Sequence, residues 1–170
     1  GVDTCESSPA KGFHLHSWAA GNVARQCERV GAACVYISTC GLFGDEVKFY
    51  SEYDQVQLKT QYARSKFMGV EASLHHCSRT FVVRPGWLFG GTEKHQRNFV
   101  YQRYQEARNK PLLSSASDKF GCPTFTQDLA AKMLEVVESE EYGLYHITNS
   151  GSASRYDYVK CIVESFGLDT

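Results

Sequence analysis

Three short apolar runs, separated by longer segments of helical periodicity, limit this chain to one class of fold. The runs cover residues 33–38, 80–88 and 144–148 and are rich in β-branched and aromatic side chains. Runs of this length and composition are typical of buried parallel strands. Because helical segments lie between successive runs, the strands are expected to pair in parallel through right-handed crossovers. We therefore expect an α/β fold with a narrow parallel sheet.

Cap and turn signals place the other elements. We expect helices over residues 10–30, 61–76, 98–109 and 126–139, with a last helix from 154 onward. Gly31 suits the left-handed C-cap of the first helix, and Ser154 with Asp157 has the spacing of a capping box. The first helix carries its larger apolar side chains at Trp18, Val23 and Val30. Loops or irregular segments are expected over 41–60, 90–97 and 112–125.

Composition excludes several classes of partner. The chain has 170 residues, of which 42% are hydrophobic, enough for one core and hence for a single domain. With 18 basic and 19 acidic residues the formal net charge is −1, which gives no field to attract nucleic acid or an anionic membrane. The sequence has no long apolar run and no secretory h-region, so we expect a cytoplasmic protein without membrane insertion.

Cysteine and histidine spacing does not indicate a metal site. The 7 cysteines include no C-x-x-C pair, and most are expected to be small core residues in a reducing compartment. His14 with His16, and the 75–77 His-His-Cys run, lack the paired spacing of a zinc site. We therefore predict that the chain holds no metal.

One set of polar residues indicates chemistry on a carbonyl or an alcohol. Tyr62 and Lys66 are four residues apart on an expected helix, and Thr39 follows the first strand. A free tyrosine has a pKa of about 10, and a nearby ammonium would lower that pKa toward the working range. Thr39 would hold a substrate oxygen while Tyr62 transfers the proton. The spacing also occurs by chance, with a half-buried aromatic residue beside a solvated lysine.

The order of motifs along the chain narrows the choice. The motifs are Val2 to Pro9, Val35 to Thr39, Tyr62 to Lys66, Val83 to Gly90, Gly121 to Thr124, Asp128 to Ala130 and Gly143 to Asn149. Together they resemble the extended short-chain dehydrogenase/reductase family, and within it the dTDP-4-dehydrorhamnose reductases. The resemblance implies a partial Rossmann-like parallel sheet, the C-terminal half of a doubly wound fold, plus a small substrate-binding lobe. It implies one domain over 1–170, with 98–142 contributing mainly to the lobe.

The resemblance also implies roles for individual residues. The catalytic residues would be Thr39, Tyr62 and Lys66. The residues beside an NADP or NAD cofactor would be Ser38, Tyr62, Lys66, Pro85 and Gly86. The residues beside a nucleotide-sugar substrate would be Thr39, Trp87 and Asn98. Core burial explains Trp87 equally well, and a helix cap explains Asn98 better.

The implied function is a reductase of a nucleotide-linked 4-keto-deoxysugar, with hydride from NAD(P)H and Tyr62 as proton donor, in dTDP-rhamnose biosynthesis. The alternative is a non-catalytic regulatory subunit of the same fold that binds sugar nucleotide or NADP. Two departures from the family favour the alternative. The glycine-rich phosphate loop is absent, as though the chain began after the fourth strand, and Cys40-Gly41 replaces an acidic residue and an aromatic one. His16 stands where an asparagine is usual. We expect a homo-oligomer or association with the missing N-terminal part.

Overall fold

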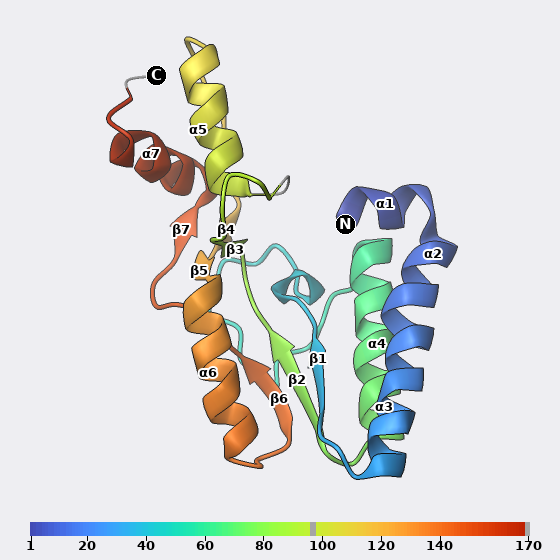
Figure 1. The fold of residues 1–170 in the computed structure, drawn as a ribbon. Coiled ribbons are helices and arrows are strands. Elements are labelled where there is room, and N and C mark those ends of the chain that lie inside the picture. Colours follow the sequence, from blue (N-terminus) through green and yellow to red (C-terminus); the bar gives the residue numbers. More distant parts are fainter. Residues whose placement is uncertain (96–97, 169–170) are drawn as a thin grey trace. The chain divides into compact units, whose positions relative to one another are not determined.

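The computed structural model describes residues 1–95 and 98–168, which form two compact units (Figure 1). The first unit contains Gly1–Pro85 and Lys132–Ile147, and the second contains the described residues of Gly86–Ala131 and Thr148–Thr170. The second unit shares residues 98–131 with the predicted substrate lobe. Of the loop predicted over 90–97, residues 96–97 lie outside the described residues.

A three-stranded parallel sheet forms the centre of the first unit. Its strands, in spatial order, are β1 (Cys34–Ile37), β2 (Thr80–Arg84) and β6 (Gly143–His146). Val35 is in register with Phe81, and Val82 with Leu144. The predicted α/β fold with a narrow parallel sheet is thus confirmed. All five residues of β2 are buried, as expected for a central strand.

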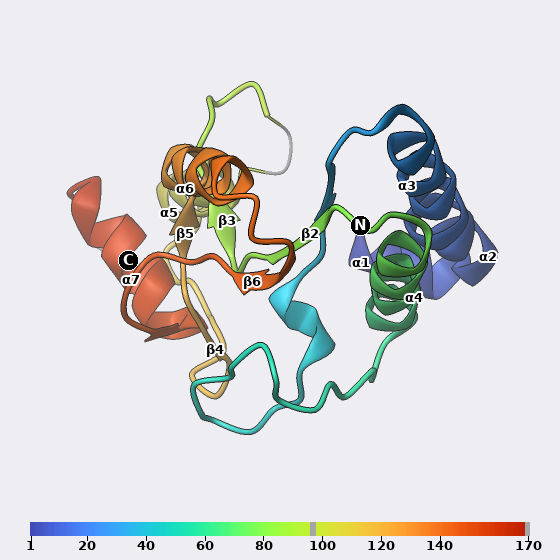
Figure 2. The same ribbon diagram turned by 90° about the horizontal axis from the view of Figure 1, so that it is seen from below.

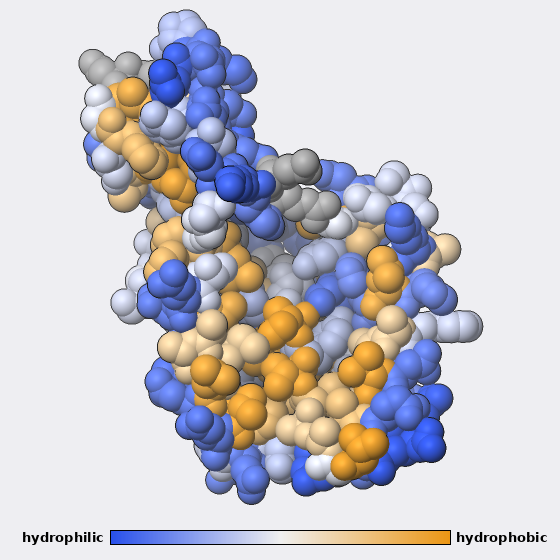
Figure 3. All heavy atoms as spheres, in the orientation of Figure 1, coloured by the Kyte–Doolittle hydropathy of each residue, from blue (hydrophilic) through white to orange (hydrophobic). Residues whose placement is uncertain are grey.

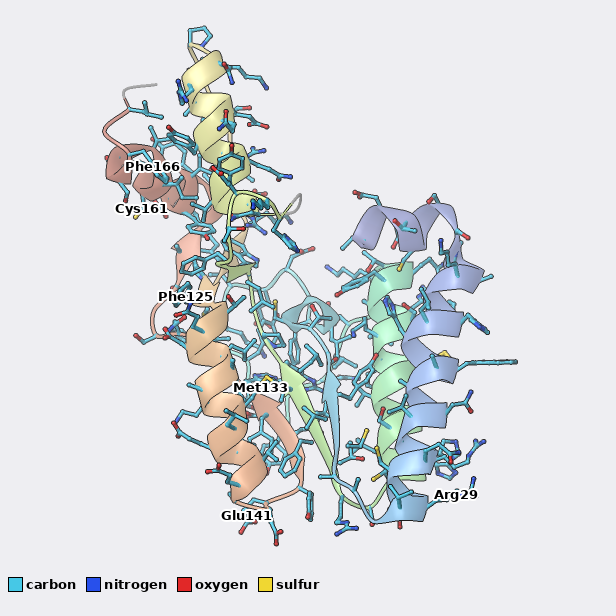
Figure 4. All side chains as sticks on the ribbon, in the orientation of Figure 1. Arg29, Phe125, Met133, Glu141, Cys161 and Phe166 are labelled. Carbon is cyan, nitrogen blue, oxygen red and sulfur yellow. The ribbon has the colours of Figure 1, made fainter. Side chains whose placement is uncertain are left out.

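A long helical segment and a second helix pack together beside the sheet (Figures 1 and 2). The long segment consists of α1 (Val2–Ser7), α2 (Pro9–Phe13), a π-helical turn η1 (His14–Trp18) and α3 (Ala19–Val30). Its partner is α4 (Gln61–His76), whose bounds match the prediction. Gly31 ends α3 in the left-handed conformation, with φ of 71°, as predicted. Arg29, in the last turn of α3, complements the negative end of the helix dipole (Figure 4).

The face of the long helical segment that packs inward is lined by small residues. Ser17, Gly21 and Ala24 are buried, following the i, i+4, i+7 spacing of one helix face. The larger apolar side chains point to solvent instead: Trp18 is 69% exposed and Val30 is 76% exposed. Small side chains let two helix backbones approach closely. The helices are therefore held by contacts between their backbones and small side chains, and not by large apolar side chains.

Two clusters of buried side chains connect these helices to the sheet. Tyr36 and Val82 of the sheet pack against Val70 of α4. At the other end of the strands, Cys34 and Cys77 pack with Ala24, and partly buried Cys27 covers them. Burial raises the pKa of the Cys34 thiol to about 11, and Cys27 and Cys77 add to the shift.

The cysteines are divided between core and surface. None of the seven forms a disulfide in the described part of the chain. Cys5, Cys34 and Cys77 are buried, as predicted, whereas Cys40 and Cys161 are exposed (Figure 4). The core role expected for most of them therefore holds for only part of the set.

The second unit combines helices with very short strands. Its helices are α5 (Phe99–Asn109), α7 (Arg155–Ser165) and the first part of α6 (Thr126–Glu138). Its strands are β3 (Leu88–Phe89), β4 (Phe120–Gly121), β5 (Thr124–Phe125) and β7 (Ala153–Ser154), paired as β3–β5 and β4–β7. Ser154 and Asp157 form the predicted capping box. Tyr104 of α5 contacts Phe166, with ring centroids 4.4 Å apart (Figure 4).

Hydrophobic residues gather over the strands on the face seen in Figure 3. Val35 and Ile37 of β1 are each 38% exposed. No strand among the described residues pairs with the outer edge of β1. Within the same residues, no helix has the length and apolar character needed to cross a membrane.

Candidate active site

Thr39 lies directly beyond the carboxyl end of β1. Its backbone is extended, and its Oγ1 accepts a hydrogen bond from the N–H of Gly41 at 3.0 Å, which caps the short 3₁₀ turn η2 (Cys40–Leu42). The preceding residue, Ser38, is buried, and its hydroxyl has no hydrogen-bond partner among the described residues. A buried hydroxyl without a hydrogen-bond partner lowers the stability of the fold, so a ligand or water that bonded to it would be stabilised here.

Tyr62 is held in the first turn of α4. Thr60 caps this helix by accepting from the N–H of Ala63 at 3.0 Å. The carboxylate of Glu6 accepts from the N–H of Tyr62 at 3.2 Å. The side chain of Tyr62 is half-buried, and the side chain of Thr39 lies near enough to lower the pKa of the phenol. The phenol and the hydroxyl predicted to act together are therefore close together.

Lys66 lies one helical turn further along α4. Its ammonium donates to the carbonyl oxygen of Ile37 at 2.5 Å, at the end of β1. The same ammonium lies 4.5 Å from the ring centroid of Tyr36, in a cation–π contact. The structure thus brings Thr39, Tyr62 and Lys66 to the carboxyl end of one strand, where open α/β sheets bind ligands.

The electrostatics differ from the expectation for Tyr62. Burial raises its pKa, the hydrogen bond from Thr39 lowers it in part, and nearby Cys40 and Cys5 raise it further. Lys66 was expected to lower the pKa of the phenol, but its ammonium is bonded to the backbone carbonyl of Ile37. Burial also lowers the pKa of Lys66, to about 8. At neutral pH the phenol is therefore protonated.

The backbone of β2 continues along the same edge. The N–H of Ser38 donates to the carbonyl of Val83 at 2.7 Å, and the N–H of Cys40 donates to the carbonyl of Pro85 at 3.0 Å. Pro85 is buried beside the Thr39 segment. Gly86, the other residue expected beside the cofactor, begins the second unit.

A polar cluster that the sequence interpretation missed covers the ends of β2 and β6. The carboxylate of Glu52 accepts from the N–H of His146 at 2.7 Å, and Nδ1 of His146 donates to the carbonyl of Tyr50 at 3.1 Å. Arg84 is buried in register with His146 and lies over the ring of Phe43, 5.6 Å from its centroid. These contacts hold the segment between Thr39 and Tyr62. In the sequence, only the charged Arg84 inside an apolar run indicated that such a polar cluster would be present, because a buried charge needs polar partners.

Trp87 belongs to the second unit, where both a cation and a glycine approach its ring. The guanidinium carbon of Arg155 lies 3.8 Å from the ring centroid. A Cβ on Gly121 would lie 2.4 Å from Cε2 of Trp87, so only glycine permits this approach. Tyr158 stacks nearby, with centroids 6.3 Å apart. Trp87 is partly exposed, so its ring can pack against the protein on one side and contact a ligand on the other.

Asn98 serves as the N-cap of α5. Its side-chain oxygen accepts from the N–H of Tyr101 at 3.1 Å, and its side-chain amide donates to the carbonyl of Thr92 at 3.2 Å. The helix-cap interpretation of Asn98 is thereby confirmed. Its predicted contact with substrate stays a prediction.

Across residues 1–95 and 98–168, no group of three or more His, Cys, Asp and Glu side chains is placed to hold a metal ion.

The parallel sheet, with these groups at the carboxyl end of β1, corresponds to part of the short-chain dehydrogenase/reductase fold. The family model described as "RmlD substrate binding domain" matches residues 1–170. The chain belongs to this family.

Curated relatives are named for polysaccharide biosynthesis or as dTDP-4-dehydrorhamnose reductases. The chain is 34% identical over 170 residues to the spore coat polysaccharide biosynthesis protein SpsK of Bacillus subtilis, covering 99% of this chain and 59% of the relative. It is 31% identical to the dTDP-4-dehydrorhamnose reductase of Mycolicibacterium smegmatis, covering 99% of this chain and 52% of that enzyme. The chain thus spans little more than half the length of these relatives.

Solved structures agree with the sequence relatives. The dTDP-4-dehydrorhamnose reductase of Bacillus anthracis, in complex with NADP, matches with a TM-score of 0.93 at 30% identity, covering 100% of this chain and 60% of that one. The Clostridium acetobutylicum protein of the same name matches with a TM-score of 0.94 at 30% identity, with the same coverage.

Proposed function

We propose that this chain carries the catalytic residues and the substrate lobe of an NAD(P)H-dependent reductase that acts on a nucleotide-linked 4-keto-deoxysugar. The observation that carries the proposal is the placement of Thr39, Tyr62 and Lys66 together at the carboxyl end of β1. A carbonyl oxygen that accepts from both hydroxyls is held and protonated at the same place. Relatives named dTDP-4-dehydrorhamnose reductase support the choice of substrate class.

The roles follow from protonation state and position. Reduction of a ketone requires a proton donor, and the raised pKa of Tyr62 keeps its phenol protonated at neutral pH. Thr39 holds the C4 oxygen by a hydrogen bond while Tyr62 donates its proton to that oxygen. Lys66, one turn away, then stabilises the phenolate that remains.

The residues at the end of β1 suit a nicotinamide cofactor. A cofactor bound here would supply hydride to the sugar carbon. An ammonium has three donors, and the structure records one hydrogen bond from Lys66, so donors are left for ribose hydroxyls. The unpartnered hydroxyl of Ser38 lies at the same strand end. Pro85 and Gly86 would border the nicotinamide through their backbone.

The alternative function is a non-catalytic subunit that binds sugar nucleotide or NADP. Its specific support is that Cys40 and Gly41 follow Thr39 and that the ammonium of Lys66 is bonded to the backbone. Under this alternative the Thr39–Tyr62 contact is only structural.

Turnover separates the two functions. The full gene product would be assayed for NADPH oxidation with dTDP-4-keto-6-deoxysugars, as wild type and as Tyr62→Phe. The proposal expects Tyr62→Phe to lower kcat by about 10²–10⁴-fold. Tyr142→Phe is the matched control, because Tyr142 packs against Phe81 near the opposite end of the strands. Ligand binding without any turnover in the wild type would establish the alternative.

We also infer that the outer edge of β1 pairs with further polypeptide, either the N-terminal part expected from the family or a second copy. An unpaired strand edge invites association, and Val35 and Ile37 beside it are 38% exposed. Light scattering after size-exclusion chromatography would test this inference on the isolated chain. A stable 19.1 kDa monomer with a buried β1 edge would contradict it.

A further inference from the structure

His16 lies directly against the phenol of Tyr62. The two rings meet edge to face, with centroids 5.6 Å apart and an interplanar angle of 88°. His16 belongs to the π-helical turn η1, and such turns are rare in helices and frequent at functional sites. The imidazole is half-buried, so its contact with Tyr62 is partly screened from solvent.

The hydrogen bonds of Ser65 define the protonation of this imidazole. The hydroxyl of Ser65 donates to the carbonyl oxygen of Tyr62 at 2.9 Å, and its Oγ lies 2.9 Å from Nδ1 of His16. A hydroxyl has a single hydrogen, and the carbonyl uses it. The bond to His16 must therefore be donated by Nδ1–H. The neutral imidazole carries its proton on Nδ1 and a lone pair on Nε2.

The backbone of His16 is held as firmly as its ring. The hydroxyl of Tyr36 donates to the carbonyl oxygen of His16 at 2.9 Å, and the carbonyl oxygen of Lys66 lies 3.3 Å from the same hydroxyl. A Cβ on Gly69 would lie 2.0 Å from the same His16 oxygen, so glycine is required for this approach. Ser65 is fully buried, which prevents its hydroxyl from turning to solvent.

Burial, together with the charge of Lys66, favours the neutral imidazole. Burial lowers the pKa of His16, and the nearby ammonium of Lys66 lowers it further. The other titratable groups around this corner include Tyr36 on β1, Tyr62 on α4, Cys5 on α1 and the amino group of Gly1. At neutral pH the ring therefore packs against the phenol without charge.

We propose that His16 is a positioning residue for Tyr62, which it orients by edge-to-face packing while Nδ1–H anchors the imidazole to Ser65. This proposal rests on the proposed function, because orientation of the phenol matters most if the phenol transfers a proton. The residue acts through Tyr62 and not on the substrate.

The kinetic test compares variants that remove different parts of the contact. His16→Ala is expected to lower kcat about 10-fold while KM changes less than twofold. His16→Asn keeps an N–H donor at the reach of Nδ1 and is expected to restore part of kcat. His14→Ala is the matched control, because His14 lies on the same turn and is exposed. A His16→Ala enzyme with wild-type kcat, or with a rise in KM alone, would overturn the proposal.

Two measurements by nuclear magnetic resonance do not depend on turnover. Nitrogen shifts of the labelled imidazole should report the Nδ1–H tautomer of His16. The labelled ring of Tyr62 should flip faster in His16→Ala than in wild type and in His14→Ala. An Nε2–H tautomer or unchanged ring flipping would refute the proposal even in an inactive protein. Slow flipping lost in His16→Ala, together with no turnover in wild type, would refute only the proposed function.

Discussion

Glu52 and His146 are 94 residues apart in the sequence, and the carboxylate of Glu52 accepts a hydrogen bond from the backbone N–H of His146 at 2.7 Å. Burial raises the pKa of Glu52, but this hydrogen bond and the charges of His146 and Arg84 outweigh it, so the net shift is downward. The contact attaches the loop between Thr39 and Tyr62 to the end of β6. The loop is therefore held by the sheet and not by its own secondary structure.

Glu52→Gln should loosen this loop. The substitution removes the negative charge beside buried Arg84, and a buried charge that loses its partner is costly, so we expect a loss of about 1–3 kcal/mol in the free energy of unfolding. Limited proteolysis should cut the 43–58 segment faster. Glu46→Gln is the control, because Glu46 forms an exposed ion pair with Lys48 and should change stability by less than about 0.5 kcal/mol. Equal effects of the two variants would contradict the attachment.

Gly69→Ala should separate η1 from α4. The added Cβ would lie 2.0 Å from the His16 carbonyl oxygen and 2.1 Å from the hydroxyl of Tyr36, which leaves no room without backbone movement. We expect a loss of about 1–3 kcal/mol, measured by urea unfolding. Gly21→Ala is the matched helical control: its Cβ would meet Ala72 and His76 at 3.3 Å, a much milder approach than at Gly69, so its effect on stability should be smaller. A Gly69→Ala protein as stable as wild type would show that the helices can part freely.

Stability should depend on pH through Lys66. Its pKa is lowered to about 8 in the folded chain and returns to about 10.4 on unfolding. Between these values the unfolded chain binds more protons at this position, so wild-type stability should rise with pH relative to Lys66→Met. Below pH 8 Lys66 is protonated in both the folded and the unfolded chain, and the full free-energy cost of burying its charge is present. After allowance for solvent screening, the gain is on the order of 1 kcal/mol. Urea unfolding of both proteins at pH 7 and pH 10 measures it, and an unchanged difference would contradict the burial of the ammonium.

Trp87 can be tested for packing and ligand contact separately. Arg155→Met keeps the length of the side chain but removes the cation 3.8 Å from the Trp87 centroid, so stability should fall by about 1 kcal/mol with KM unchanged. Trp87→Phe keeps an aromatic ring and should raise KM for the sugar nucleotide several-fold. Thermal unfolding and steady-state kinetics measure the two effects. A Trp87→Phe protein that loses stability at constant KM would assign Trp87 to the core alone.

Local patterns in the sequence predicted the sheet and the main helices well. Apolar runs bounded by turn residues located β1, β2 and β6, and caps such as Ser154 are read from residues close in sequence. The inward face of the first helix does not follow from its larger apolar residues, because close approach selects small residues there and Trp18 and Val30 face solvent. The two-residue strands have no periodicity to detect.

The site could be predicted only in part, because short sequence patterns do not report contacts between residues far apart in the chain. The Thr39–Tyr62 contact follows from strand and helix placement, which short patterns indicate. The environment of Glu52 depends on a contact across the chain that no local pattern encodes. The direction of the Lys66 ammonium toward the Ile37 carbonyl is likewise a property of the folded packing.

The packing of Cys27, Cys34 and Cys77 allows local opening of the helix end to be followed by thiol alkylation. Thiols react as thiolates, and the raised pKa of Cys34 keeps its thiol protonated in the closed structure. An alkylating reagent can modify Cys34 and Cys77 only when the end of α3 lifts from the sheet. The rate at which Cys34 and Cys77 themselves are modified in native buffer, separated by peptide mass from the exposed Cys40 and Cys161, therefore reports those openings.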